Sequence, residues 1–487
     1  MRFRWLTTWL ASAALLTTPI GCATGAPASV EHTTGDAAVP MAARLDPIVH
    51  AAGANVAVRV IELPSRRELY AVEADRAMLP ASNMKLVTTA TALDLFGPDH
   101  TFETRLAVAG NDLYLVGGGD PALGDSTIAG WQHLKPLDQF APFVRALRAR
   151  DRARVKGALY FDDRALDGQW TLSSWHERPR DYWYAAPSGG LNFNDNCIDV
   201  TVYPTTPGQP VRYEVFPPTS IIHIVNRCVT ADGGERGEPS VAPGAGDNEY
   251  VLSGVCAKKT ALPSKSVGDP GLFTADVFRT YLAGKGITIA GGTERAAAGP
   301  NAQVIATLKS APLSAILKRV NKPSQNFLAE VLAKQSGERY RATHTGATGT
   351  SWQMGEAAAK EFLARSGIAA EQLRAADGSG LSREDRVTAR MLTDLLAAMN
   401  RRPGAPVFRD SLPIAGVDGT IKGRLTQVKG RVFAKTGSIR GVRALSGYAV
   451  TADGRTLAFS ILCNDIQGDE AVGGVARIDD IVRAMLK

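Results

Sequence analysis

A serine and a lysine three positions apart, Ser82 and Lys85, constrain this chain more than any other stretch of its sequence. The run from Lys85 to Phe96 is rich in apolar residues compatible with a helix, and Pro80 and Ser82 are residues that commonly begin one. Ser82 is therefore predicted to open a helix, with Lys85 one turn along on the same face. A hydroxyl at a helix N-terminus with an amine nearby has the base and the backbone N–H groups that an activated nucleophile requires.

Two later motifs decide between catalysis and a structural role, because serine often caps helices and lysine is common on their surfaces. Ser-Gln-Asn occupies positions 324–326 before a helix-like run, and Lys-Thr-Gly-Ser occupies positions 435–438 at the end of a strand-like run. Ser-x-x-Lys occurs only at Ser82, and Ser-x-Asn only at Ser324. In this order, Ser-x-x-Lys, Ser-x-Asn and Lys-Thr-Gly form the motif triplet of the penicillin-recognising serine enzymes. Together they favour catalysis.

A second candidate for the third motif is His-Thr-Gly at positions 344–346, but no strand-like run precedes it, so Lys435 is preferred. No histidine lies within ten residues of the three motifs, and the sequence has neither a Gly-x-Ser-x-Gly elbow nor His-Glu-x-x-His. A Ser-His-Asp triad or a zinc site is therefore poorly supported. A site built on serine and lysine needs no metal and no cofactor, and we expect none.

The composition is that of a globular protein, with 45% hydrophobic and 21% charged residues, and 487 residues suffice for two or three domains. The formal charge of +7 is mild for this length. It suits contact with an anionic wall or membrane surface, and a solvated basic surface explains it equally well. No nucleic-acid partner is expected.

Residues 1–23 are predicted to be a signal peptide. They begin with two arginines, continue with an apolar run that ends at Leu16, and finish with a group of small residues. Cleavage after Ala23 or Ala26 fits such a signal. The preceding Ile-Gly-Cys resembles a lipoprotein box, in which Cys22 would be lipidated. Both alternatives stay open, and in either case the protein is expected to be exported to the periplasm, free or anchored to the membrane through Cys22.

Five cysteines are present, and none has zinc-site spacing. The segments that end at Cys228 and Cys256 read as strands joined by a polar loop. An oxidising compartment would favour a disulfide between them, and buried thiols are the alternative. The state of Cys197 is equally open.

Roughly 240 residues separate the first two motifs, which is too long for a loop and predicts one or two inserted domains. The predicted division is a signal peptide (1–23), a linker (24–45), a first catalytic part (46–105), the inserted domain or domains (106–269) and a second catalytic part (270–487). Four tryptophans of the insert could line a glycan groove, but we expect them in its core. They are Trp131, Trp170, Trp175 and Trp183.

Predicted elements flank each motif. Strands are expected at 55–63, 68–72, 101–108, 112–116, 304–308, 431–437, 444–451 and 456–463. Helices are expected at 142–150, 272–283, 355–365, 388–400 and 478–486, with another that begins at Leu313.

With these motifs in place, the chain resembles the class C low-molecular-mass penicillin-binding proteins, the D-alanyl-D-alanine carboxypeptidase and endopeptidase family. The resemblance extends over nearly the whole mature chain and includes the long insert and the segments 115–121, 191–196, 377–382 and 416–420. It implies an α+β fold, in which helices pack on the antiparallel sheet of a penicillin-recognising serine transpeptidase-like domain that carries one or two inserted β-rich domains.

The resemblance also implies roles for the motif residues. Ser82 would attack the carbonyl of the penultimate D-alanine, and Lys85 would take the serine proton. Lys85 must then be neutral, and desolvation or the nearby charge of Lys435 is expected to lower its pKa. The N–H groups of Ser82 and Ser438 would form the oxyanion hole. The other expected roles are proton relay by Ser324, amide binding by Asn326 and carboxylate binding by Lys435, Thr436 and the adjoining Gly437.

The expected partners are peptidoglycan peptides ending in D-Ala-D-Ala, with β-lactams as covalent inhibitors. The sequence does not separate carboxypeptidase from endopeptidase activity, since both use one acyl-enzyme on similar bonds. A β-lactamase is a weaker alternative, because no motif supplies a deacylating glutamate. A receptor that is acylated but barely turns over is the alternative from a different class, and measurable peptide turnover would eliminate it.

Overall fold

The computed structural model describes residues 40–51, 55–175, 182–233, 237–467 and 470–487. The predicted signal peptide, Cys22 and residues 24–39 of the predicted linker lie outside this part. The linker prediction to residue 45 is wrong at its end, because helix α1 (Met41–His50) begins at Met41 and buries Leu45 against the sheet. None of the described helices has the length and apolar character needed to cross a bilayer.

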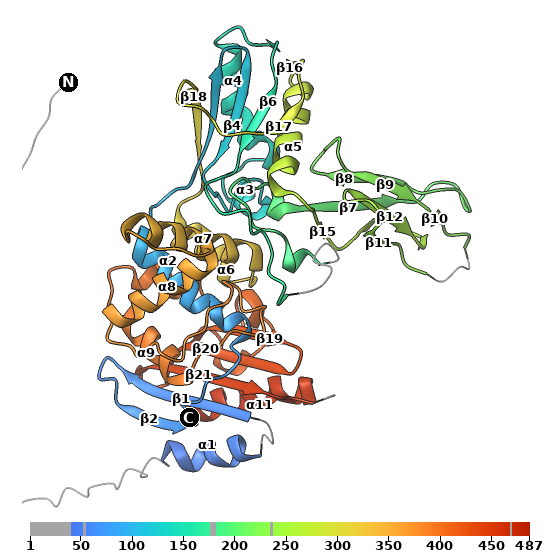
Figure 1. Ribbon diagram of the computed structural model, residues 1–487. Coiled ribbons are helices and arrows are strands. Elements are labelled where there is room, and N and C mark those ends of the chain that lie inside the picture. Colours follow the sequence, from blue (N-terminus) through green and yellow to red (C-terminus); the bar gives the residue numbers. More distant parts are fainter. Residues whose placement is uncertain (1–39, 52–54, 176–181, 234–236, 468–469) are drawn as a thin grey trace, which may run out of the picture. The chain divides into compact units, whose positions relative to one another are not determined.

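A five-stranded antiparallel sheet supports the motif residues, and it combines the two ends of the described chain. Its order is β19-β20-β21-β1-β2, so the blue and red strands of Figure 1 lie side by side. The first strand is paired along its whole length, from Asn55 opposite Asn464 to Leu63 opposite Thr456. The strands are β1 (Asn55–Leu63), β2 (Glu68–Val72), β19 (Val432–Ile439), β20 (Val442–Val450) and β21 (Thr456–Asn464).

Helices cover both faces of this sheet, as expected for the predicted α+β class. α1 and α11 (Glu470–Met485) pack on one face in a single hydrophobic cluster. On the other face the central helix is α2 (Met84–Phe96), which is buried on all sides from Met84 to Leu93 because its sequence is apolar or small all round. Around it lie α6 (Leu313–Asn321), α7 (Asn326–Thr343), α8 (Ser351–Arg365), α9 (Ala389–Met399) and α10 (Ala405–Ser411).

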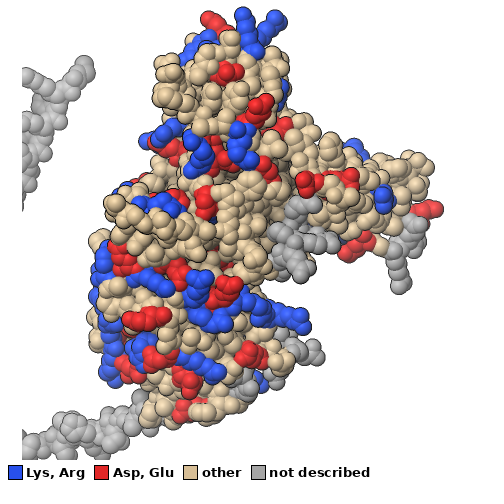
Figure 2. All heavy atoms as spheres, in the orientation of Figure 1, with Lys and Arg blue, Asp and Glu red and all other residues tan. Residues whose placement is uncertain are grey.

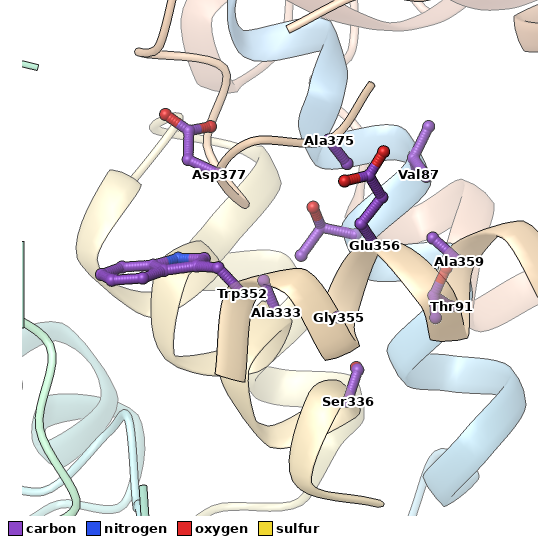
Figure 3. A pocket seen from close by; sticks show the side chains of 11 residues that line it. Val87, Thr91, Ala333, Ser336, Trp352, Gly355, Glu356, Ala359, Ala375 and Asp377 are labelled. Carbon is purple, nitrogen blue, oxygen red and sulfur yellow. The ribbon is translucent and has the colours of Figure 1, made fainter. Parts of the chain in front are cut away.

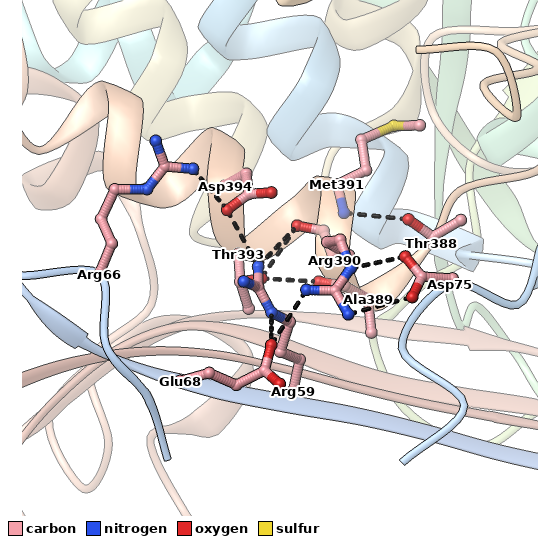
Figure 4. A network of polar contacts seen from close by, with 10 residues as sticks. All are labelled: Arg59, Arg66, Glu68, Asp75, Thr388, Ala389, Arg390, Met391, Thr393 and Asp394. Carbon is pink, nitrogen blue, oxygen red and sulfur yellow. Dashed lines mark hydrogen bonds and ion pairs between the residues drawn. The ribbon is translucent and has the colours of Figure 1, made fainter. Parts of the chain in front are cut away.

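A polar network attaches α9 to the sheet (Figure 4). The guanidinium of Arg59 on β1 is buried and donates to Glu68 on β2 at 2.8 Å and to Asp394 on α9 at 2.9 Å. Arg390, one turn before Asp394, donates to Glu68 and to both carboxylate oxygens of Asp75. Arg59 can be buried because its charge is paired with Glu68 of the sheet and with Asp394 of the helix layer.

The insert has its own sheet and core. The sheet order is β17-β6-β4-β3-β18, and α4 (Ala141–Arg148) and α5 (Pro270–Gly284) pack in the same hydrophobic cluster. The strands are β3 (Glu103–Ala109), β4 (Asp112–Gly117), β6 (Leu159–Asp162), β17 (Thr293–Arg295) and β18 (Gln303–Lys309).

The predicted domain division stays a prediction, but the pairing bears on its second boundary. β18 pairs with β3 from Gln303 opposite Val108 to Lys309 opposite Glu103. We therefore propose that the insert continues past residue 269, to Lys309.

The middle of the insert is a set of short strands. The longest is β7 (Cys197–Tyr203), which pairs with β8 (Arg212–Phe216), β14 (Thr260–Ala261) and β15 (Lys265–Ser266). Next to them are β9 (His223–Asn226), β11 (Ser240–Pro243) and β12 (Glu249–Ser253) in one sheet, and the pair β10 (Val229–Thr230) and β13 (Val255–Cys256).

The disulfide between Cys228 and Cys256 is absent, because both are buried free thiols, as is Cys197. In the parallel pair β10–β13, Cys256 lies opposite Thr230, so Cys228 is offset by two residues. Strand spacing and rise then put the two α-carbons on the order of 8 Å apart, beyond the reach of about 7 Å that a disulfide has.

The tryptophan prediction is right for Trp175, which is 7% exposed, and wrong for two others. Trp131 is 51% exposed because it ends the short helix α3 (Ser126–Trp131) at the surface, and Trp183 is 42% exposed. Trp183 lines a surface pocket together with Gln325, the middle residue of the second motif. Trp170 is half-buried, with the guanidinium of Arg295 over its ring.

Candidate active site

Ser82 lies in a tight turn held between two glycines. The α-helix begins at Met84 rather than at Ser82, because Ala81–Asn83 forms a 3-10 turn with Ala81 at φ 45°. A Cβ on Gly437 of β19 would stand 2.6 Å from the carbonyl oxygen of Pro80, and one on Gly380 would stand 1.8 Å from that of Ala81. Only glycine allows both segments to approach this turn so closely. The strained conformation of Ala81 is thus fixed from two sides.

The amine of Lys85 is completely buried and reaches three oxygen atoms. Its Nζ lies 3.0 Å from Ser82 Oγ, 2.7 Å from Asn326 Oδ1 and 2.8 Å from the carbonyl oxygen of Ser379. The side-chain amide of Asn326 is held in this orientation because its Nδ2 donates a hydrogen bond to the carbonyl oxygen of Tyr184 at 2.9 Å.

These partners orient the lone pair of a neutral lysine. Asn326 Oδ1 and the carbonyl of Ser379 can only accept hydrogen bonds, so they take both N–H groups of a neutral amine. The third direction, toward Ser82 Oγ, is left for the lone pair, and the serine hydroxyl can donate to it. This is the arrangement that a general base needs before it removes the serine proton.

Burial lowers the pKa of Lys85 to about 8. The carboxylates of Glu330, Asp377 and Asp385 act in the opposite direction. Desolvation, one of the two expected causes, is therefore the main reason for the lowered pKa of Lys85. Lys435 is itself fully buried, and burial followed by the charge of Lys85 holds the pKa of Lys435 well below its usual range.

The second and third motifs meet beside this pair. Lys435 Nζ donates to Ser324 Oγ at 2.8 Å and to the carbonyl oxygen of Thr436 at 3.0 Å. Ser324 has φ 65°, which turns the chain just before α7 begins at Asn326. The rival His344 is engaged elsewhere, stacked on Tyr340 and 3.1 Å from a carboxylate oxygen of Glu361.

Strand β19 is the last strand of its sheet, and residues 413–415 pair with the beginning of its outer edge. Along this edge Ala434 donates its backbone N–H to Pro413, and Val432 accepts from Ala415. The backbone N–H and C=O groups of the even-numbered residues of β19 therefore point away from β20. By the same alternation, the N–H of Ser438 also points away from β20. Thr436, on the same edge, has its hydroxyl 2.8 Å from that of Thr420.

The structure thus brings Ser82, Lys85 and Asn326 into one hydrogen-bonded group and Ser324 and Lys435 into a second. The sequence did not predict the roles of the Tyr184 and Ser379 carbonyls, because a motif of side chains does not identify backbone groups. It also missed the buried acids. Among the described residues, no group of three or more His, Cys, Asp or Glu is placed to hold a metal ion.

Known proteins resemble this chain in fold and in sequence. Penicillin-binding protein 4 of Haemophilus influenzae superposes with a TM-score of 0.73 at 24% identity, over 91% of this chain and 97% of that one. A second structure of the same protein, in complex with a β-lactam, gives a TM-score of 0.70 at 24% identity, over 92% of this chain and 98% of that one. The D-alanyl-D-alanine carboxypeptidase of Actinomadura sp. (strain R39) is 34% identical over 85% of this chain and 79% of its own length.

The fold is accordingly that of penicillin-binding protein 4, which confirms the predicted α+β fold class. The model of the D-Ala-D-Ala carboxypeptidase 3 (S13) family matches residues 41–485. The chain belongs to this family of serine peptidases.

Proposed function

We propose that this protein is a D-Ala-D-Ala carboxypeptidase and endopeptidase that acts on peptidoglycan stem peptides and cross-links through an acyl-enzyme at Ser82. One observation carries the assignment of the nucleophile. Lys85 Nζ has two partners that can only accept and a third, Ser82 Oγ, that can give up its proton.

Acylation follows from this geometry. The lone pair of Lys85 removes the hydroxyl proton of Ser82 as Oγ attacks the carbonyl carbon of the penultimate D-alanine. The N–H groups of Ser82 and Ser438 stabilise the oxyanion, and losing one such donor costs about 3–4 kcal/mol in comparable enzymes. The C–N bond then breaks, and the departing amine receives a proton through Ser324. Water later hydrolyses the ester and restores the free serine.

The leaving group distinguishes the two activities. In a carboxypeptidase reaction it is free D-alanine, and in an endopeptidase reaction it is the amine of a second peptide. Free D-alanine carries a carboxylate next to the scissile bond, which Lys435 and Thr436 would bind. On the face shown in Figure 2, basic side chains lie beside the region of β19 together with acidic ones.

A β-lactam would acylate the same serine, because its strained amide places a carbonyl and a carboxylate at comparable positions. The tethered product has no amine that can diffuse away, so deacylation is expected to be slow. The predicted export and the choice between free and lipid-anchored forms are part of this proposal, since peptidoglycan lies outside the cytoplasm.

The decisive test is intact-protein mass spectrometry after incubation with benzylpenicillin, combined with release assays. The wild-type protein is expected to gain one adduct and to release D-alanine from a peptide ending in D-Ala-D-Ala. Ser82→Ala should do neither while remaining folded, and Ser240→Ala, in the exposed strand β11, should match the wild type. Acylation or full activity in folded Ser82→Ala would refute the assignment. An adduct without peptide release would favour the receptor alternative.

Release from a cross-linked muropeptide dimer, measured beside release from the pentapeptide, would show how the activity divides between the two bonds.

A further inference from the structure

A buried glutamate that acts electrostatically on Lys85 has no part in the chemistry described above. Glu330 is on α7, one turn after Asn326, and is 1% exposed. Its Oε2 accepts from the backbone N–H of Gly378 at 2.9 Å and from the indole N–H of Trp352 at 2.8 Å. Its other oxygen, Oε1, is buried as well. A carboxyl group so placed is costly unless its charge serves a neighbour.

Glu330 is connected to Lys85 through one short loop. Gly378, which donates to Glu330, is followed by Ser379, whose carbonyl accepts from Lys85. Thr88, one turn after Lys85 on α2, donates its hydroxyl to the carbonyl of Gly378 at 2.7 Å. The loop is therefore held from α2 and from α7 at adjacent residues.

Asp377, at the start of this loop, has all its acceptor capacity in use. Its carboxylate accepts from Ser379, Gly380 and Ser382 and from the indole of Trp175. These four N–H donors fix the carboxylate of Asp377 in place.

Charged groups face Glu330 from each element packed against it. They are Lys85 on α2, Lys334 on its own helix, and Asp377 and Asp385 on the loop, while α8 contributes the neutral Trp352. Burial, followed by the charge of Asp377, raises the pKa of Asp385 well above its usual range. Among these acids, Glu330 is the one on α7, the helix that also carries Asn326, and it is joined by Gly378 to the loop whose Ser379 carbonyl contacts Lys85.

We propose that Glu330 is a positioning residue that sets the basicity of Lys85: its carboxylate offsets the effect of burial, and it holds the loop whose Ser379 carbonyl orients the amine. This inference rests on the proposed serine–lysine function. Burial without a compensating anion would give a lysine that is neutral but a poor base, whereas an unopposed anion would keep it protonated.

The burial that makes Lys85 easier to deprotonate also makes Glu330 easier to protonate. Burial, followed by the charge of Asp377, raises the pKa of Glu330. The state in which Lys85 and Glu330 are both charged and the state in which both are neutral are therefore close in free energy. Figure 3 shows the small cavity beside the cluster, with Trp352 and Asp377 on its wall; Glu330 does not line it.

The test is the pH profile of acylation by benzylpenicillin in Glu330→Gln, which keeps an acceptor for Gly378 and Trp352 but cannot carry charge. The acidic limb is expected to move to lower pH by on the order of one unit, because the anion that raises the pKa of Lys85 is gone. At high pH the variant should be slower than the wild type, because a lysine of lower pKa is a weaker base. The two profiles should therefore cross.

Glu338→Gln is the matched control, since Glu338 lies two turns further along α7 and bonds to Arg341 and Ser351 instead. Its profile should follow that of the wild type. A folded Glu330→Gln variant whose acidic limb coincides with the wild type would overturn the inference while leaving the Ser82 assignment intact. No acylation of the wild type would instead refute the proposed function itself.

If Glu330→Gln does not fold, Trp352→Phe decides the question. It removes one of the two donors to the Glu330 carboxylate and keeps an aromatic ring in place. With less stabilisation of the anion, the acidic limb should again move to lower pH, by less than in Glu330→Gln. An unchanged or opposite shift in folded Trp352→Phe would contradict the inference.

Discussion

Replacing Gly380 by alanine should disable the site through the backbone alone. Gly380 has φ +85°, a conformation that costs an L-residue about 1–2 kcal/mol. The new Cβ would stand 1.8 Å from the carbonyl oxygen of Ala81 and 3.0 Å from the backbone nitrogen of Ser82. Relief of this overlap requires the loop or the nucleophile turn to move by more than about 1 Å, a misplacement that can cost about a hundredfold in rate.

The overlap adds about 1–3 kcal/mol of overpacking to the backbone cost. We therefore expect Gly380→Ala to lower the free energy of unfolding by about 2–5 kcal/mol and to reduce benzylpenicillin acylation about a hundredfold. Denaturant unfolding and the acylation rate measure the two effects separately. Gly367→Ala is the control, because Gly367 has φ +69° with no atom within 4 Å, so it should lose only the backbone term and acylate normally. Wild-type acylation by Gly380→Ala would refute this account of the turn.

Two more predictions concern the buried charges. Lys85 must be neutral to act as a base, and its pKa is about 8; it loses its proton as the pH rises, so wild-type acylation should fall about tenfold for each pH unit below that value. A rate that stays flat from about pH 8 to about pH 6 would contradict this. Asp377→Asn keeps one acceptor oxygen and leaves two buried N–H donors without partners, which should cost about 1–3 kcal/mol each in denaturant unfolding. An unchanged unfolding midpoint would show that the loop does not depend on this carboxylate.

The sequence predicts the local elements well, because each has a strong pattern of its own. The strands 55–63 and 68–72 have the predicted bounds, and the helix begins at Leu313 as expected. The start of α2 is wrong by two residues, because Gly380 and Gly437 hold residues 81–83 in a tighter turn, and neither constraint is visible near position 82.

The motif residues lie together, as their family resemblance implies, but their electrostatics could not be predicted from the motifs. Lysine at position 435 suggests a positive neighbour that would lower the pKa of Lys85. In the fold both amines are buried, so desolvation dominates, and carboxylates from distant segments oppose it. Burial depends on the whole fold rather than on motif spacing.

Glu330 had a faint signal. It is a charged residue inside the apolar run from Phe327 to Leu332, one turn after Asn326. A helix that is apolar on both sides of a glutamate indicates a buried acid with a partner. The partners themselves, Gly378 and Trp352, come from a loop and from α8, and no local pattern links them to it.

The pairing of β3 with β18 has a consequence for how the polypeptide is assembled. Glu103 and Lys309 are register partners, so the folded insert brings its two ends within about 5 Å, one strand spacing. Joining these ends across an unstructured segment of roughly 200 residues would cost about 5 kcal/mol in chain entropy. An insert that folds on its own core offsets that cost before the catalytic part is complete. The long insert between the first and second motifs thus holds the segment that carries Ser82 and Lys85 close to the segment that carries Ser324.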